Sequence, residues 1–260
     1  MLLTERPPRP GTLTWQLLME PRGRSGAENM AIDAALLERA DATGDAFLRL
    51  YRFDPPCLSL GRNEAAGSYD RAAIARLGVD VVRRPTGGGA VWHEHEVTYA
   101  VAAPSAAFGG LRQAYHAIHT RLAAALRTLG ADAALASDRQ TAHPPHRPGP
   151  CFARPVGGEV LVRGRKLVGS AQVRRGGALL QHGSILLDGS QQLIAVVRGE
   201  AQAASGATTL AEALGRPVTW HEVVAAVVQA WGDECTPAAP SRPPPPCTAL
   251  FLDPAWTWRR

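Results

Sequence analysis

Strand-like and helix-like stretches follow one another in this chain without regular alternation, and this order constrains its fold more than any other feature. The clearest helix is expected over Leu111–Leu129, where apolar residues recur every three or four positions and Gly130 follows as a stop. Regular alternation of strands and helices would predict a parallel α/β sheet, whereas this irregular mixture predicts the α+β class.

Local signals set the remaining elements. Capping boxes beginning at Ser25 and Thr219 predict two helix starts, the first helix ending near residues 40–43 and the second at Trp231. Ala46–Phe53 alternates in character, which predicts a strand with one buried face. A polar, Pro-rich loop is expected over 137–150. Further helices are expected at Arg71–Leu77 and Thr209–Leu214, and further strands at Thr14–Leu18, Cys57–Leu60, Val79–Arg83, Val97–Ala102, Glu159–Arg163, Lys166–Val173 and Ser184–Leu187.

The composition narrows the class of protein. Of 260 residues, 45% are hydrophobic and 20% charged, which is typical of a globular chain, and the length favours one domain with elaborations. The formal net charge of +5 favours acidic partners. The arginines are scattered, however, so we expect no nucleic-acid partner. No stretch approaches the roughly 20 apolar residues that span a bilayer, so we expect no membrane partner and a cytoplasmic location.

One lysine, Lys166, stands among the 28 Lys and Arg residues. A lysine amine can shift its pKa and exchange a proton, whereas a guanidinium stays charged. Cys151 lies upstream in a Pro/Gly-rich loop, and a thiolate near an ammonium is a typical nucleophile. A coding bias toward arginine would explain the composition equally well. The other cysteines form no C-x-x-C pair, so we expect free thiols and no metal site.

Three segments could bind a ligand. Three consecutive glycines, Gly87–Gly89, follow a predicted strand, and their N–H groups could bind an anion or a carbonyl; a hairpin turn is an equal alternative. Small residues in the Lys166 strand predict a bulky neighbour against it. The candidate ligand-binding residues are Arg84, Thr86, Gly87, Gly88, Gly89, His93, Gly169, Ser170, His182 and Gly183.

Taken together, five segments resemble the lipoate–protein ligase/octanoyltransferase superfamily, which shares its catalytic fold with biotin protein ligase. The segments are Asn29-Met-Ala-Ile-Asp33, Leu58-Ser-Leu-Gly-Arg62, Arg83-Arg-Pro-Thr-Gly-Gly-Gly-Ala-Val-Trp-His93, Gly164-Arg-Lys-Leu-Val-Gly-Ser-Ala-Gln172 and Gln181-His-Gly-Ser-Ile-Leu-Leu187. The resemblance implies a mixed, mostly antiparallel sheet flanked by helices. It also implies a catalytic domain over residues 14–235, a connector and tail packed on it over 236–260, and a loose tail over 1–13.

Within the superfamily, the chain most resembles the cysteine-dependent octanoyltransferases of the LipM type. Cys151 precedes the Lys166 strand, where these enzymes place their nucleophile, and His93-Glu-His-Glu-Val-Thr-Tyr99 is similar to their H-x-x-E-[LV]-T-Y segment. Two positions depart from this pattern: Gly89 replaces a common arginine and Ala100 a common serine. The alternatives are an ATP-dependent lipoate ligase and an amidotransferase that moves octanoyl groups between lipoyl domains.

The resemblance implies transfer of an octanoyl group from acyl carrier protein through a Cys151 thioester to a lysine of a lipoyl domain, such as the glycine cleavage H protein. Lys166 would lower the pKa of the Cys151 thiol, contact the acyl carbonyl or accept the proton of the incoming lysine. The glycine triplet and His182 would line the acyl tunnel. No cofactor is expected, because ATP and Mg²⁺ belong to the ligase alternative alone.

Overall fold

The computed structural model of the chain describes residues 13–137, 151–152, 156–200, 206–232, 235–239 and 245–259. Residues 1–12 and nearly all of the predicted loop 137–150 lie outside these ranges. The strands are β1 (Trp15–Met19), β2 (Ala46–Tyr51), β3 (Cys57–Leu60), β4 (Asp80–Arg83), β5 (Val91–His93), β6 (Glu96–Pro104), β7 (Ala133–Leu135), β8 (Val160–Val162), β9 (Arg165–Arg175), β10 (Ala178–Leu186) and β11 (Cys235–Pro237). The helices are α1 (Gly26–Thr43), α2 (Arg71–Leu77), α3 (Leu111–Thr128), α4 (Leu193–Val197), α5 (Leu210–Leu214), α6 (Trp220–Trp231), α7 (Pro245–Leu252) and α8 (Pro254–Thr257).

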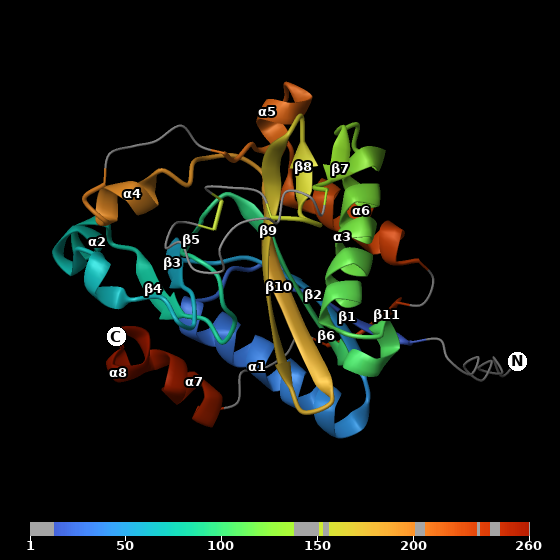
Figure 1. Cartoon of the computed structure of the whole chain (residues 1–260), viewed down its shortest axis with the longest axis horizontal. Coiled ribbons are helices and arrows are strands. Elements are labelled where there is room, and N and C mark those ends of the chain that lie inside the picture. The colour runs from blue at the N-terminus through green and yellow to red at the C-terminus, as the bar shows by residue number, and fades with distance from the viewer. Residues whose placement is uncertain are drawn as a thin grey trace, which may run out of the picture.

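Two sheets organise the described residues (Figure 1). The larger has eight strands in the order β11-β1-β2-β6-β10-β9-β8-β7, and only the β1–β11 and β1–β2 pairs within it are parallel. The smaller has the order β4-β3-β5. The mixed, mostly antiparallel sheet flanked by helices is therefore confirmed.

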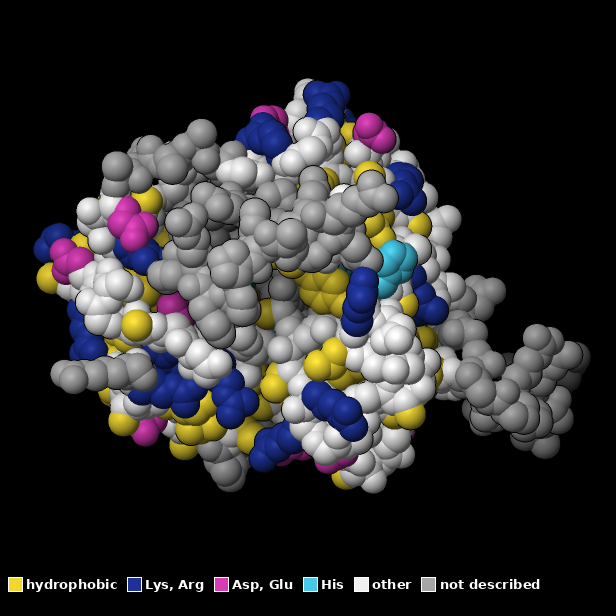
Figure 2. Space-filling model, in the orientation of Figure 1, with side chains coloured by type: hydrophobic (Ala, Val, Ile, Leu, Met, Phe, Trp, Pro, Cys, Tyr) yellow, Lys and Arg dark blue, Asp and Glu magenta, His cyan; other side chains and the backbone are white. Residues whose placement is uncertain are grey.

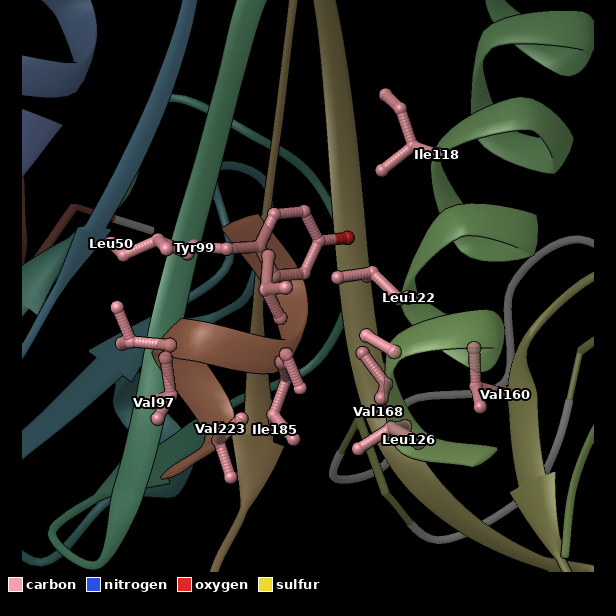
Figure 3. Close-up of a cluster of buried hydrophobic side chains, with 14 of the residues drawn as sticks. Leu50, Val97, Tyr99, Ile118, Leu122, Leu126, Val160, Val168, Ile185 and Val223 are labelled. Carbon is pink, nitrogen blue, oxygen red and sulfur yellow. The ribbon is translucent and has the colours of Figure 1, made fainter. Parts of the chain in front are cut away.

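The two faces of the large sheet bury different clusters. On one face α3 and α6 pack against the sheet, and Figure 3 shows Ile118, Leu122 and Leu126 of α3 directed toward Tyr99 and Val168 of the strands. On the opposite face α1 covers the sheet through residues that include Met30 and Leu37. Apolar burial of this kind contributes about 25 cal/mol per Å², and it fixes α1 against the strands that carry the site.

The helix ends follow the sequence signals. Ser25 and Glu28 form a capping box at the start of α1, and Thr219 and Glu222 form another at the start of α6. Gly44 adopts φ 78°, a left-handed conformation that ends α1 without the strain a Cβ would bring. These predicted helix boundaries are confirmed.

Two strand predictions were wrong. β2 is buried on both faces instead of one, because it lies between β1 and β6 and is covered by helices on each side. β10 begins at Ala178, so His182 and Gly183 belong to its centre and pair with β6 and β9. The glycine at 183 conceals this strand in the sequence, since glycine is poor in strand propensity.

The C-terminal tail is held by one arginine. Arg83 is fully buried, and its guanidinium donates to the carbonyls of Trp256, Thr257 and Arg259 as well as to Gly61 and Glu64. The indole of Trp256 returns a hydrogen bond to the Arg83 carbonyl at 2.9 Å. The tail is thereby fastened to the last residue of β4, next to Arg84.

None of the helices in the described ranges is long and apolar enough to cross a membrane.

Candidate active site

A cavity opens where the two sheets meet α1. Its walls come from α1, the end of β2, the small sheet, and the centres of β6, β9 and β10. The lining residues are Met30, Tyr51, Phe53, Ser59, Arg84, Val91, His93, Thr98, Cys151, Gly169, Ser170, Ala171, His182, Gly183 and Ser184.

The structure brings Cys151 and Lys166 together at this cavity. The Lys166 ammonium lies 3.7 Å from the Cys151 sulfur and donates to the Cys151 carbonyl at 2.6 Å. Cys151 is half-buried, and its backbone N–H donates to Ala90 across the cavity wall. The two residues predicted to act together are therefore in contact.

A carboxylate that sequence analysis did not single out completes this pair. Glu159 accepts a hydrogen bond from Lys166 at 2.5 Å, and both side chains are almost wholly buried. Burial lowers the pKa of Lys166, but the charges of Cys151 and Glu159 raise it further, so the net pKa lies above its ordinary value. Lys166 therefore favours the ammonium form, and its expected role as a proton acceptor stays a prediction.

Glu159 carried a weak signal in the sequence. It is a lone acid at the start of an apolar strand, and β8 pairs with β9 through a hairpin that places Leu161 opposite Lys166. A charge entering a buried strand needs a partner, and the chain's single lysine lies on the neighbouring strand.

His182 lines the cavity as expected, but its ring is already committed. Its Nδ1–H donates to the Asp33 carboxylate at 2.8 Å, and its Nε2 accepts from the Thr86 hydroxyl at 2.6 Å. Burial lowers the pKa of His182, so the ring is neutral and this tautomer is fixed. Asp33 and Thr86 thus orient His182 as a wall of the cavity.

His93 sits in a similar cage. Its Nδ1 lies 2.6 Å from Glu96 and its Nε2 lies 2.7 Å from the Ser59 hydroxyl, while its ring stacks on Phe53 at 4.1 Å. Both nitrogens are occupied, so His93 shapes the cavity wall between β5 and the end of β2.

The glycine triplet does not line the cavity. The carbonyls of Gly87 and Gly89 accept hydrogen bonds from the Arg84 guanidinium, both at 2.7 Å, and Gly88 packs against Gly61 with φ 87°. The expectation that the triplet lines the tunnel was therefore wrong, because the turn folds its carbonyls onto Arg84. Arg84 itself reaches the cavity.

The small residues of β9 and β10 leave space for an aromatic ring, as predicted. A Cβ on Gly169 would lie 2.7 Å from the Phe152 ring, and one on Gly183 would lie 2.3 Å from the Gly169 carbonyl. Phe152 is buried, and the Lys166 ammonium lies 5.1 Å from its ring centre. Phe152 therefore packs beside Cys151 on the lining of the cavity.

We expect Gly169→Ala to destabilise the fold by about 1–3 kcal/mol, since the added methyl overpacks the buried ring of Phe152. Urea unfolding followed by circular dichroism measures this loss. Gly87→Ala is the matched control, because a Cβ there meets no atom within 4 Å. Equal stability of the two variants would contradict the packing described for Phe152.

A buried polar chain underlies the cavity floor, and sequence analysis did not identify it. Gln181 donates to the Tyr99 hydroxyl, which lies 2.6 Å from the Ser170 hydroxyl, and Ser170 lies 2.8 Å from His119 Nε2. The Nδ1–H of His119 donates to the Gly158 carbonyl at 2.7 Å. The chain thus links Ser170 in the cavity to the residue that precedes Glu159.

Burial lowers the pKa of His119 to about 4, although its bond to Gly158 opposes this. The ordinary value is about 6.5, so the unfolded chain binds the proton first. The stability that His119 contributes is therefore complete above about pH 6.5 and is lost as the pH falls toward 4.

We expect wild type to lose about 2 kcal/mol more stability than His119→Gln between about pH 8 and about pH 5, because glutamine does not titrate. Urea unfolding at both pH values measures the difference. His116→Gln, an exposed change one turn earlier in α3, should retain the wild-type dependence. A parallel pH dependence of wild type and His119→Gln would show that the ring is not kept neutral.

The arrangement supplies a thiol beside a buried ammonium, on the lining of a cavity whose two histidines are held by hydrogen bonds. This arrangement of side chains is suited to nucleophilic catalysis on a substrate with an apolar tail. No group of three or more His, Cys, Asp or Glu side chains within the described ranges is arranged to hold a metal ion.

The sequence matches the model of the lipoyl protein ligase A/B catalytic domain over residues 25–232. It is 42% identical over 196 residues to octanoyltransferase LipM of Moorella thermoacetica, which covers 73% of this chain and 71% of that protein. It is 40% identical over 225 residues to octanoyltransferase LipM of Symbiobacterium thermophilum, which covers 80% and 81% of the two chains.

Solved structures with the same fold are more distant in sequence. A lipoate-protein ligase A bound with ATP superposes with a TM-score of 0.77 at 18% identity, covering 95% of this chain and 99% of that one. A putative lipoate protein ligase of Thermoplasma acidophilum with bound lipoic acid gives a TM-score of 0.74 at 19% identity, covering 95% and 100%. At this identity the likeness establishes the fold.

Proposed function

Because the chain belongs to the family of lipoyl protein ligase A/B catalytic domains, we propose that it is an octanoyltransferase that works through an acyl-Cys151 thioester in lipoate biosynthesis. Its similarity to two octanoyltransferases over most of its length supports this activity. The observation that carries the proposal is the Cys151 sulfur, 3.7 Å from the Lys166 ammonium on the wall of the cavity.

In the first half-reaction, the Cys151 thiolate attacks the carbonyl carbon of an octanoyl thioester presented by acyl carrier protein. A C–S bond forms to Cys151, the C–S bond to the donor breaks, and the donor leaves as a thiolate that takes a proton from solvent. Lys166 remains an ammonium, and the N–H that points at the Cys151 sulfur turns to the developing oxyanion as the sulfur is acylated. One thioester replaces another, so no ATP is needed.

In the second half-reaction, the free amine of a lipoyl-domain lysine attacks the acyl-Cys151 carbonyl. A C–N bond forms, the C–S bond breaks, the amine releases one proton to solvent, and Cys151 returns as a thiolate. The acceptor we propose is the lipoyl domain of a protein such as the glycine cleavage H protein. The net charge of +5 favours encounter with acidic carrier proteins. Figure 2 shows arginines spread over the face of the molecule seen in Figure 1, with acidic side chains among them.

The cavity lining offers apolar surface to an octanoyl chain. Met30, Val91 and Phe53 offer apolar surface along its wall, while the cavity-lining histidines are occupied by hydrogen bonds. Burying the tail of an eight-carbon acyl group at about 0.8 kcal/mol per CH₂ supplies about 5 kcal/mol of binding. Tail burial of this size discriminates between acyl lengths.

The test supplies a lipoyl-domain protein with each acyl source in turn and follows its modification by mass. Octanoyl-acyl carrier protein without ATP should modify the domain. Modification that requires ATP and a free acid would instead establish a ligase. Modification only from an already octanoylated lipoyl domain would establish an amidotransferase.

A further inference from the structure

The positive charge of Lys166 is already compensated. Its ammonium donates to Glu159, to the Cys151 carbonyl and to the Cys151 sulfur, so its three N–H bonds are all in use. Since Glu159 lies 2.5 Å away and both groups are buried, the pair carries no net charge. A thiolate at Cys151 would leave this corner of the cavity with a net negative charge, which is costly in a buried site.

Arg84 is the opposite case, a buried cation without a carboxylate. It is only 4% exposed, and its acceptors are neutral: the carbonyl and hydroxyl of Ser59 and the carbonyls of Gly87 and Gly89. No carboxylate of the described residues forms an ion pair with it, and its Nε has no hydrogen-bond partner among them. Burial lowers the pKa of Arg84, and the Cys151 charge partly restores it.

The carboxylate that acts on the Arg84 charge already accepts hydrogen bonds from other groups. The Glu64 carboxylate acts on Arg84 from a distance, but it accepts hydrogen bonds from Gly61, Tyr69 and Ala90. Its negative charge is therefore already stabilised within the loop between β3 and α2. A buried cation without an adjacent anion lowers stability unless some state of the site supplies one.

Arg84 and Cys151 share one wall of the cavity. Both line it, and the Arg84 guanidinium donates to Gly89 while the next residue, Ala90, accepts from the Cys151 backbone at 3.0 Å. Tyr99 and Tyr115 add no charge near the sulfur, because burial raises the pKa of each hydroxyl far above neutrality. The sulfur thus contacts a neutral ion pair and lines the same cavity as an uncompensated guanidinium.

We propose that Arg84 supplies the uncompensated positive charge that stabilises the thiolate of Cys151, while the Lys166–Glu159 pair donates hydrogen bonds to Cys151. The inference rests on the proposed function, in which Cys151 is the nucleophile. Buried charge balances at this site only when the sulfur is ionised: Lys166 with Glu159, and Arg84 with Cys151.

The test is the alkylation rate of Cys151 by iodoacetamide, followed on the Cys151 peptide by mass spectrometry from about pH 6 to about pH 9, which brackets the ordinary thiol pKa. We expect Arg84→Gln to slow alkylation at neutral pH about tenfold and to move the profile about one unit toward higher pH. Arg84→Lys keeps the charge and should keep a rate close to wild type.

Arg83→Gln is the matched control. It removes a buried guanidinium one residue away that lies outside the cavity lining, so its melting temperature should fall while the Cys151 profile stays in place. An unchanged profile in folded Arg84→Gln overturns the inference. So does an equal shift in Arg83→Gln, or an Arg84→Lys rate that falls as far as that of Arg84→Gln.

Alkylation requires no acyl substrate, so the inference and the proposed function fail separately. An Arg84-dependent profile in a protein that transfers no octanoyl group would support the charge assignment and reject the activity. Octanoyl transfer by a protein whose alkylation profile does not depend on Arg84 would support the activity and reject the charge assignment.

Discussion

Cys151→Ala is expected to lower octanoyl transfer by at least about a thousandfold, because removing a nucleophile removes the covalent route and leaves only the binding of the two substrates. The variant should fold normally, since Cys151 is half-buried and the change to alanine removes only its sulfur. The measurement is the initial rate of lipoyl-domain modification from octanoyl-acyl carrier protein, with the melting temperature recorded in parallel.

Cys247→Ala controls for general effects of losing a thiol. Cys247 lies on α7, away from the cavity, and should retain the wild-type rate. Cys151→Ser keeps a hydroxyl at the same position, but a hydroxyl without an adjacent base is a poor nucleophile. A serine variant with the full wild-type rate would remove the thiolate from the mechanism.

Arg49→Met is expected to destabilise the protein by about 3–5 kcal/mol, because it leaves buried carboxylates without their cation. Arg49 is fully buried in β2 and pairs with Glu20 at 2.6 Å and with Asp33 at 2.8 Å. Asp33 in turn holds His182, so the cavity wall should also loosen. Urea unfolding at neutral pH measures the stability.

The loss of unfolding free energy in Arg49→Met, relative to wild type, should be smaller at acidic pH. Burial raises the pKa of Asp33, but its hydrogen bond to His182 and the charge of Arg49 lower it further, so the net pKa lies below its ordinary value. The contribution of Asp33 is thus complete above about pH 4 and is lost as the pH falls through the folded-state pKa. Without Arg49 the Asp33 carboxyl protonates more readily. The difference in unfolding free energy between wild type and Arg49→Met therefore becomes smaller as the pH falls.

Arg39→Met provides the exposed comparison for this experiment. Arg39 pairs with Asp45 at 3.3 Å, but its side chain is 53% exposed, and such pairs contribute about 1 kcal/mol or less. If Arg49→Met cost no more than Arg39→Met, the ion pairs around Arg49 would not be the stabilising network described for α1, β1 and β2.

The sequence predicted the outer frame of the fold where local chemistry decides the structure. Capping boxes at Ser25 and Thr219 and the glycine after α1 fix helix ends through bonds a few residues apart. The short strands β7 and β11 were missed because their pairing depends on distant partners. β2 was assigned one exposed face, since nothing local reveals that Arg49 would find buried carboxylates on two other elements.

In the site, too, some features were predictable from the residues themselves, while others depend on partners brought together by the fold. The pairing of Cys151 with Lys166 was expected from two rare residues, and the structure brings them together. His119 was missed because its role depends on a residue far along the chain, and Glu159 because its role depends on the strand pairing that brings Lys166 beside it. The glycine triplet was misread, since three glycines permit many backbone paths and only the Arg84 contacts select one.

The most direct test mixes the protein with octanoyl-acyl carrier protein in the absence of ATP and of any acceptor, and then records its intact mass. The account predicts a gain of one octanoyl group that maps to the Cys151 peptide, is released by hydroxylamine as a thioester should be, and disappears when a lipoyl domain is added. An unmodified protein that nevertheless octanoylates the domain, or an adduct on any other residue, would contradict it.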